Sequence, residues 1–147
     1  MAGKVHKIQL SQGKYALVDI NQANKLNALG KWTYHAQGYA YRWDRSTKPH
    51  KCLLMHRIIM DTPKGMDTDH INRNKLDNRK SNLRIVTRSA NNLNRETLGV
   101  EKSKHWSGYV VRIMADKTRL YIGRFKNKEE AMHISSDIKQ QLLEAIL

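Results

Sequence analysis

The sequence predicts an α+β protein built from short antiparallel strands and a few helices. Three observations support this prediction. Stretches of alternating apolar and polar residues recur along the chain, with turn-forming residues between them. Residues 20–29 and 129–142 instead place apolar side chains at helical spacing. A polar segment at residues 68–83 has too little apolar surface for an ordinary core element, and a strand-like stretch and a helix start follow it.

The N-terminal segment predicts a hairpin followed by a short helix. In KIQLSQGKYALVDI, apolar residues alternate on both sides of a turn formed by SQGK. Asp19 is a candidate N-cap, and Gly30 can end the helix. The apolar face of this helix is expected to contain Ile20, Ala23, Leu26 and Leu29.

The next segment, GYAYRW, predicts a strand with three aromatic side chains on one face, because Tyr39, Tyr41 and Trp43 alternate. That face is either part of a small core or a surface for stacking and sugar contacts. The core is favoured, since a small domain needs large apolar side chains. The run CLLMHRIIM is apolar enough to be buried, but its periodicity does not decide between strand and helix.

The composition indicates a polyanionic partner. The 147 residues include 27 Lys or Arg against 13 Asp or Glu, a net charge of +14. A positive field of this size favours nucleic acid or an acidic membrane surface. The membrane is the weaker alternative, because the sequence shows no strongly amphipathic basic helix and no apolar run of the roughly 18 residues that span a bilayer.

Two features that the sequence lacks bear on where the protein is located and on its cysteine chemistry. The N-terminus MAGKVHKIQL lacks a signal-peptide core, so we expect a cytoplasmic protein of a prokaryotic or phage-infected cell. The single cysteine, Cys52, excludes a disulfide framework and a cysteine-ligated zinc knuckle.

The polar segment TDHINRNKLDNRKSNL holds the candidate chemistry. Asp69 and His70 stand side by side at its start, and Asn91 or Asn92 at the following helix start could face them. Carboxylate and amide oxygens suit Mg²⁺ rather than Zn²⁺, and a histidine can take a proton from water at neutral pH. These are the parts needed for phosphodiester hydrolysis. Asx turns and a chance Asp-His pair are the competing explanation.

The stretch TDHINRNKLDNRKSNLRIVTRSANNLNR closely resembles the HNH endonucleases of the phage and intron-homing type, and the resemblance covers residues 53–95. It implies a ββα-metal core that binds one Mg²⁺ or Mn²⁺ ion. By this resemblance, His70 is the general base, Asn82 braces the loop and orients the base, and Asp69 and Asn91 are metal ligands. His56 matches a recurring histidine, for which packing or a supporting contact is favoured over metal ligation.

Basic residues surround this motif. As a set beside a hydrolytic centre, they are expected to contact phosphates, although a solvated charged face is the alternative for any one of them. The candidates are Arg73, Lys75, Arg79, Lys80, Arg84 and Arg88, with Arg95 extending the same basic surface.

Residues 99–142 predict three short antiparallel strands and a helix that begins near Glu129 and Glu130. The strand order and YIGRF…EEA resemble the ethylene-response-factor domain of plant regulators, which implies DNA contact through the exposed sheet. Glu101 and Leu98 depart from arginines expected in that family, which leaves base preference undetermined. The positions that match, or share the sheet, are Tyr109, Arg112, Arg119 and Tyr121.

Together these patterns predict three regions: a supporting region at 1–52, the HNH core at 53–98 and the C-terminal domain at 99–147. The leading hypothesis is a site-directed, homing-type DNA nickase that acts on double-stranded DNA, as a monomer or a homodimer. The alternative is a DNA-binding regulator that has kept an HNH scaffold without cutting. The four motif residues present together argue against the alternative.

Overall fold

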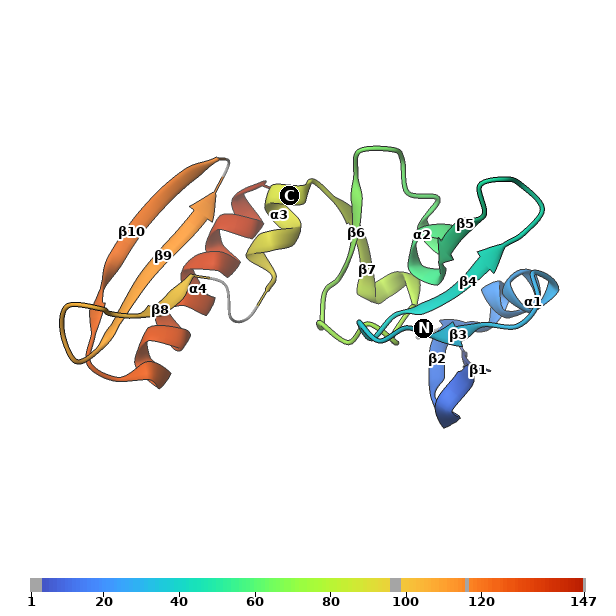
Figure 1. Cartoon of the computed structure of the whole chain (residues 1–147), viewed down its shortest axis with the longest axis horizontal. Coiled ribbons are helices and arrows are strands. Elements are labelled where there is room, and N and C mark those ends of the chain that lie inside the picture. Colours follow the sequence, from blue (N-terminus) through green and yellow to red (C-terminus); the bar gives the residue numbers. More distant parts are fainter. Residues whose placement is uncertain (1–3, 96–98, 116, 147) are drawn as a thin grey trace. The chain divides into compact units, whose positions relative to one another are not determined.

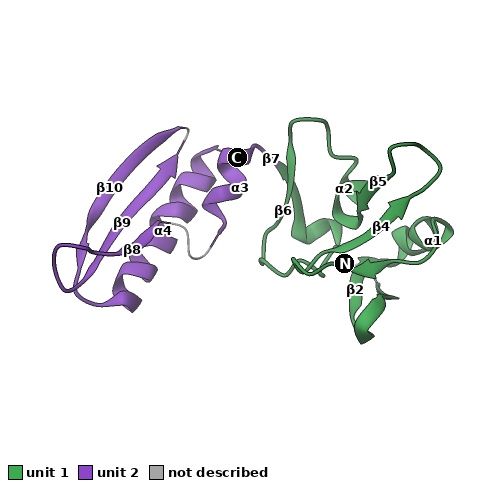
Figure 2. Ribbon diagram, in the orientation of Figure 1, with its two compact units in different colours: residues 1–85 green, residues 86–147 purple. Residues whose placement is uncertain are grey.

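A computed structural model describes residues 4–95, 99–115 and 117–146. The chain forms two compact units, residues 1–85 and residues 86–147 (Figure 2). Each unit has a hydrophobic core of its own, and both combine helices with small antiparallel sheets, as an α+β protein should (Figure 1).

Unit 1 begins with the predicted hairpin and helix. Strand β1 (Val5–Gln9) pairs antiparallel with β2 (Tyr15–Asp19), and a short 3-10 turn, η1 (Ser11–Gly13), joins them. Helix α1 (Ile20–Ala28) follows directly and buries Ala23 and Leu26. Asp19 is the N-cap residue by backbone geometry, but its side chain makes no capping hydrogen bond. Instead, the Asp19 carboxylate accepts a hydrogen bond from the amide of Lys80.

A three-stranded sheet and a second helix come next. Strands β3 (Thr33–Tyr34), β4 (Ala40–Asp44) and β5 (Lys51–Leu54) form this sheet in chain order. Helix α2 (Met55–Met60) begins at the next residue. The ambiguous run CLLMHRIIM is therefore strand in its first three residues and helix in its last six, which is why a single period could not describe it.

The aromatic face predicted from GYAYRW exists, but the preference for a core was wrong. Trp43 is 49 % exposed, and Tyr39 and Tyr41 are only half-buried. The unit 1 core is formed mainly by aliphatic side chains and Trp32, drawn from the N-terminal hairpin, α1, β4, α2 and β7. Because Ala40 is in that core, its alternating neighbours Tyr41 and Trp43 point away from it.

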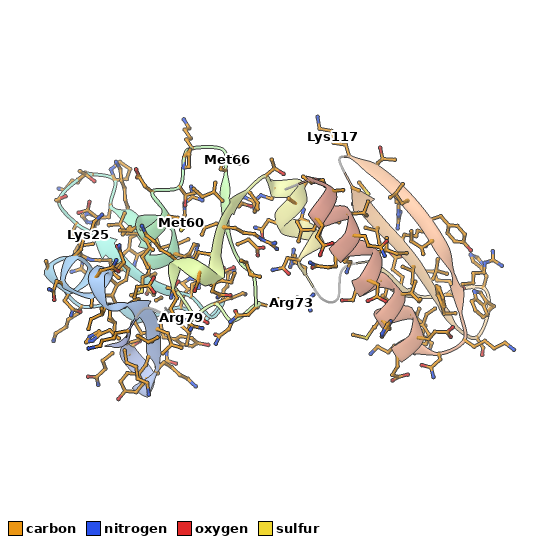
Figure 3. The ribbon with its side chains drawn as sticks, turned by 180° about the vertical axis from the view of Figure 1, so that it is seen from behind. Lys25, Met60, Met66, Arg73, Arg79 and Lys117 are labelled. Atoms are coloured by element: carbon orange, nitrogen blue, oxygen red, sulfur yellow. The ribbon has the colours of Figure 1, made fainter. Side chains whose placement is uncertain are left out.

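The polar segment joins two strands, as expected. Strand β6 (Asp67–His70) pairs with β7 (Leu83–Val86), and the loop between them contains the 3-10 turn η2 (Lys80–Asn82). Before β6, the chain turns through Pro63 and Gly65, and the Arg57 guanidinium donates to the carbonyl of Met66 at 2.9 Å. Met60, Met66 and Arg73 are labelled in Figure 3.

Unit 2 contains helix α3 (Arg88–Leu93), a three-stranded sheet and helix α4 (Lys128–Ile146). The sheet has the order β10-β9-β8, from β8 (Val100–Lys102), β9 (Tyr109–Ala115) and β10 (Thr118–Phe125). This confirms the predicted three strands and helix. Thr87 is the N-cap of α3, and its Oγ1 accepts from the Ala90 amide at 3.2 Å.

The unit 2 core lies between the sheet and the two helices. It combines Val111 and Ile113 of β9 with Ala131 and Leu143 of α4 and apolar residues of α3. The predicted boundary after residue 98 stays a prediction, because residues 96–98, including Leu98, lie outside the described residues. Within residues 4–95, 99–115 and 117–146, none of the helices combines the length and the apolar character needed to cross a bilayer.

Candidate functional site

The loop between β6 and β7 is ordered by hydrogen bonds from its own asparagines. The Asn82 side chain accepts from the amide of Asn72 at 3.0 Å and donates to the Asn72 side chain and to the Asp77 carbonyl at 2.9 and 2.8 Å. The Asn82 carbonyl also accepts from the amide of Ile71 at 2.9 Å. Asn82 is buried, so these contacts satisfy polar groups that water does not reach.

The N-terminal hairpin holds the same loop from outside. The amide of Leu17 donates to the carbonyl of Leu76 at 2.8 Å, and the carbonyl of Leu17 accepts from the Asn78 amide at 2.7 Å. The Asp19 carboxylate accepts from the amide of Lys80 at 2.8 Å. Backbone groups of the loop thus pair with β2 and with the start of α1, which explains why a segment so poor in apolar residues has a defined shape.

An ion pair fixes the centre of the loop. Asp77 is buried, and both of its carboxylate oxygens accept from the Arg79 guanidinium, at 2.7 and 2.6 Å. Asn72 donates a further hydrogen bond to Asp77 at 2.9 Å. Hydrogen bonding from Arg79 lowers the pKa of Asp77 below its usual value.

His70, at the end of β6, is buried against this loop. Its Nε2 lies 3.2 Å from Oδ1 of Asn78, a residue with no solvent exposure. An amide oxygen can only accept, so Nε2 carries the proton in this arrangement and the basic lone pair of a neutral ring is on Nδ1. Burial is the main influence on His70 and lowers its pKa, while Asn78 and Asp69 act in the opposite direction.

Other rings pack against His70. The ring of His56, on α2, meets it edge to face at 5.1 Å between centroids, and the Tyr39 ring lies 6.1 Å from His70 and 5.1 Å from His56. Burial, followed by the charges of His70 and Arg57, lowers the pKa of His56 to about 3. The Lys75 ammonium lies over the Tyr39 ring at 4.6 Å and donates to the Gln37 carbonyl at 2.9 Å.

Asp69, the neighbour of His70 on β6, is buried and paired with Arg84 of β7. Nε and Nη2 of Arg84 lie 2.9 and 2.7 Å from Oδ2 of Asp69. Arg84, which was predicted to contact phosphate, therefore balances the charge of the predicted metal ligand. Both side chains are largely buried, so this pairing is screened less than a surface ion pair.

The fourth motif residue, Asn91, is half-buried on α3 and belongs to unit 2, whereas Asp69, His70 and Asn82 belong to unit 1. Among the described residues, no group of three or more His, Cys, Asp or Glu side chains could hold a metal ion by itself. Asp69 carries a carboxylate and Asn91 an amide oxygen, and hard oxygen donors of these two types suit Mg²⁺.

The predicted basic residues differ in how they are placed. Arg73 and Arg79 both come from the loop after β6 (Figure 3), but Arg79 is bound to Asp77 while Arg73 is exposed. Lys80 and Arg88 are exposed as well. Lys75 is exposed too, and its ammonium lies over the Tyr39 ring, which is 6.1 Å from the His70 ring.

In unit 2, the sheet has one covered face and one open face. Tyr121 is 58 % exposed and pairs across the strands with Arg112, and Arg119 pairs with exposed Met114. Glu101 lies between the two arginines, with both guanidinium groups 3.0 Å from its carboxylate.

Tyr109 packs against the unit 2 core. Tyr109 and Val111 lie two residues apart on β9, so their side chains point to the same face of the sheet, which is the covered one. Tyr109 therefore does not lie on the open face. The predicted DNA contact of Tyr109 stays a prediction.

Several residues of the site were not predicted from the sequence. Asn78, Asp77 and Tyr39 contact His70 or the loop that supports it. His56, which was expected to pack or support rather than to bind metal, packs directly on His70. The many Asn and Asp residues of this segment indicated a loop ordered by side-chain hydrogen bonds. They did not indicate which hydrogen-bond partners Asn78 and Asp77 would have. Tyr39 lies far from His70 along the chain, so only the fold brings them together.

Comparison with known proteins supports the nuclease interpretation in part. Residues 61–93 match the model of a family described as HNH endonuclease, and these residues include Asp69, His70, Asn82 and Asn91. This match supports a nuclease whose substrate is DNA. No curated protein and no solved structure matches the chain. Unit 2 beyond residue 93 lies outside the match, so the resemblance to the ethylene-response-factor domain stays a prediction.

Proposed function

We propose that this protein is a divalent-metal-dependent DNA endonuclease that hydrolyses one phosphodiester of double-stranded DNA, in the manner of a site-directed homing nickase. The observation that supports this most strongly is the environment of His70. It is buried, in contact with Asn78 and next to Asp69, inside the segment that matches the HNH model.

His70 is the general base in this proposal. Its lowered pKa keeps the ring neutral at physiological pH, so Nδ1 can take a proton from a water molecule as the water attacks phosphorus. Asn78 fixes the tautomer by accepting from Nε2, and the rings of His56 and Tyr39 restrict the orientation of the imidazole. Asn82 supports this arrangement indirectly through the loop. The expected products carry a 5′-phosphate and a 3′-hydroxyl.

Asp69 and Asn91 would hold the ion, one Mg²⁺ or Mn²⁺ per site. When bound, such an ion supplies positive charge that stabilises the oxygen leaving phosphorus. Arg84 orients Asp69 and offsets its charge through two contacts with Oδ2. The ligand role of Asn91 and the ββα-metal arrangement both belong to this proposal, since unit 1 and unit 2 are described separately.

DNA is held by the exposed cations near the loop and by the open face of the unit 2 sheet. Arg73, Lys80 and Arg88 are exposed, which supports their proposed phosphate contacts, and Tyr121 is exposed beside Arg112. A sheet face can read duplex DNA from a groove. A regulator that binds without cutting is the alternative, and the buried, polar setting of His70 favours the enzyme.

Supercoiled plasmid tests the proposal. The protein with Mg²⁺ should convert it to open circles, and His70→Ala should lose about 100-fold or more in rate, the scale of a lost general base. EDTA should stop the reaction. Equal conversion by both proteins would remove His70 from catalysis. Binding without any conversion would favour the regulator.

A further inference from the structure

We propose that the outer side of the β4–β5 ribbon is a second DNA-binding surface, which holds duplex DNA on one flank of the scissile phosphate. The inference rests on the proposed function, because DNA is the substrate there. The surface consists of a ribbon face, formed by Tyr41, Trp43, Cys52 and Leu54, and three ribbon cations, Arg45, Lys48 and Lys51.

The ribbon face displays two aromatic rings, an exposed Trp43 and a half-buried Tyr41. Trp43 pairs across the strands with Cys52, and Tyr41 pairs with Leu54, so all four side chains lie on one side of the ribbon. The Tyr41 and Trp43 rings meet edge to face at 6.5 Å, and His35 meets Tyr41 in the same way at 5.2 Å. A tryptophan that is half exposed on a strand, with a second ring beside it, is an unusual use of apolar surface.

The connection between the strands supplies positive charge. Arg45, Lys48 and Lys51 are all exposed. Residues 40–52 contain four Lys or Arg side chains and one acidic residue, Asp44, which gives a net charge of +3. Asp44 is occupied locally, since its carboxylate accepts from the hydroxyl and the amide of Ser46 at 2.6 and 3.0 Å. Rings flanked by cations suit the sugars, base edges and phosphates of a nucleic acid.

The strand also connects this surface to the candidate active site within unit 1. Tyr39 precedes β4 and contacts His70, and Trp43 follows four residues later along extended backbone. At about 3.3 Å per residue, Trp43 lies roughly 13 Å along the strand from Tyr39. Duplex DNA rises about 3.4 Å per base pair, so the ribbon would contact DNA about four base pairs from the phosphate at His70.

Duplex DNA fits this surface better than an unpaired strand. β3 pairs with β4 only as far as Tyr41, so β4 and β5 continue beyond it as a two-stranded ribbon. The major groove accepts such a ribbon, and the ribbon cations lie at the end where the two strands are joined. A single strand would need rings spaced for successive bases. Here Tyr41 and Trp43 instead contact each other edge to face.

The first test measures binding of the full chain to a duplex that contains the mapped nick site, in EDTA so that no cutting occurs. Trp43→Ala should weaken binding about fivefold or more, as expected when a tryptophan that anchors an interface is truncated. Trp43→Tyr should keep most of the affinity. The matched control is Tyr15→Ala, on β2, because Tyr15 is also 49 % exposed but lies off the ribbon; it should bind as the parent does. Equal weakening by Trp43→Ala and Tyr15→Ala would overturn the proposal.

The ribbon cations are tested by their salt dependence. Replacing all three with glutamine should lower the slope of log K against log salt by about 0.9 for each phosphate that the protein no longer neutralises. The control removes the same charge from the N-terminal hairpin, where the exposed residues to replace with glutamine are Lys4, Lys7 and Lys14. Equal salt slopes for the two triple variants would overturn the proposal, because binding would then depend on the net charge of the protein and not on where the cations lie.

The single cysteine, Cys52, allows the position of the bound DNA relative to the ribbon face to be mapped directly. A photo-crosslinker on Cys52, which is exposed beside Trp43, should attach to duplex DNA on one side of the nick, centred about four base pairs away. Stronger attachment to single-stranded DNA, or none on either flank, would overturn the inference. Because His70→Ala can carry the same crosslinker, failure to cut and failure to crosslink are measured separately.

Discussion

At the scale of single residues, the most informative feature is a pair of buried histidines. His70 and His56 pack ring against ring, and burial lowers the pKa of both. A neutral His70 is ready to accept a proton at pH 7 without first losing one. For His56, the same burial lowers the stability of the fold in acid, because a protonated imidazole would be poorly solvated at this position.

The first prediction concerns stability in acid. The pKa of His56 is about 3 in the folded state, against 6.5 for an ordinary histidine. Between these values the unfolded chain binds the additional proton, so His56 should reduce the free energy of unfolding by up to about 1.4 kcal/mol for each pH unit lost. His56→Phe should remove this part of the slope while keeping a ring against His70. Urea unfolding between pH 7 and pH 4 measures it.

Tyr39→Phe is the control for that measurement, because a tyrosine does not ionise between pH 4 and pH 7. It alters a neighbouring ring and should keep the full pH dependence. If His56→Phe showed the same slope as the parent protein, the buried and neutral state assigned to His56 would be incorrect.

At the scale of elements, the β6–β7 loop shows that polar contacts can order a segment with almost no core. The second prediction is that Asn82→Ala destabilises the protein by about 1–3 kcal/mol, since it leaves buried polar groups without partners. Asn74→Ala, in the same loop, removes an exposed side chain that accepts from the Leu76 amide, and should cost far less. Thermal unfolding compares the two, and equal losses would contradict the bracing role of Asn82.

The third prediction concerns the unit 2 sheet. Glu101 pairs with Arg112 and Arg119 on the open face, so it offsets their charge. If this face contacts DNA, Glu101→Gln should tighten binding and steepen the salt slope by about 0.9 for each arginine that gains a phosphate. Glu144→Gln removes the same charge from the far end of α4 and should change neither quantity as much. Fluorescence-anisotropy titrations of labelled DNA at several salt concentrations measure the affinity and the salt slope of both variants. Equal affinities and equal slopes for the two variants would argue against DNA contact on this face.

How well elements could be predicted depended on the kind of pattern. The N-terminal hairpin, α1 and the three strands of unit 2 were predictable because each has one clear period. CLLMHRIIM changes from strand to helix after its third residue, and no single period fits it. The aromatic strand was assigned correctly, but its burial was not, since alternation identifies a face and cannot say what covers it.

At the scale of the whole molecule, the four motif residues are distant in sequence and are divided between the two compact units. The motif residues could be predicted because their spacing matches a known family. Asn78 and Tyr39 could not, because their contacts with His70 depend on how β2, β4 and the polar loop come together. The division of the chain between residues 85 and 86 also falls inside the motif, where no change of composition marks it.

The central claim is that Asp69 and Asn91 act as one unit with His70 on a single phosphodiester. A double-mutant cycle on the nicking rate tests it most directly, with Asp69→Asn, Asn91→Ala and the double variant compared at saturating Mg²⁺. Residues that hold one ion should give strongly non-additive losses, so the double variant should be little slower than the worse single variant. Losses that simply add, or a single variant that nicks at the parent rate, would contradict the claim.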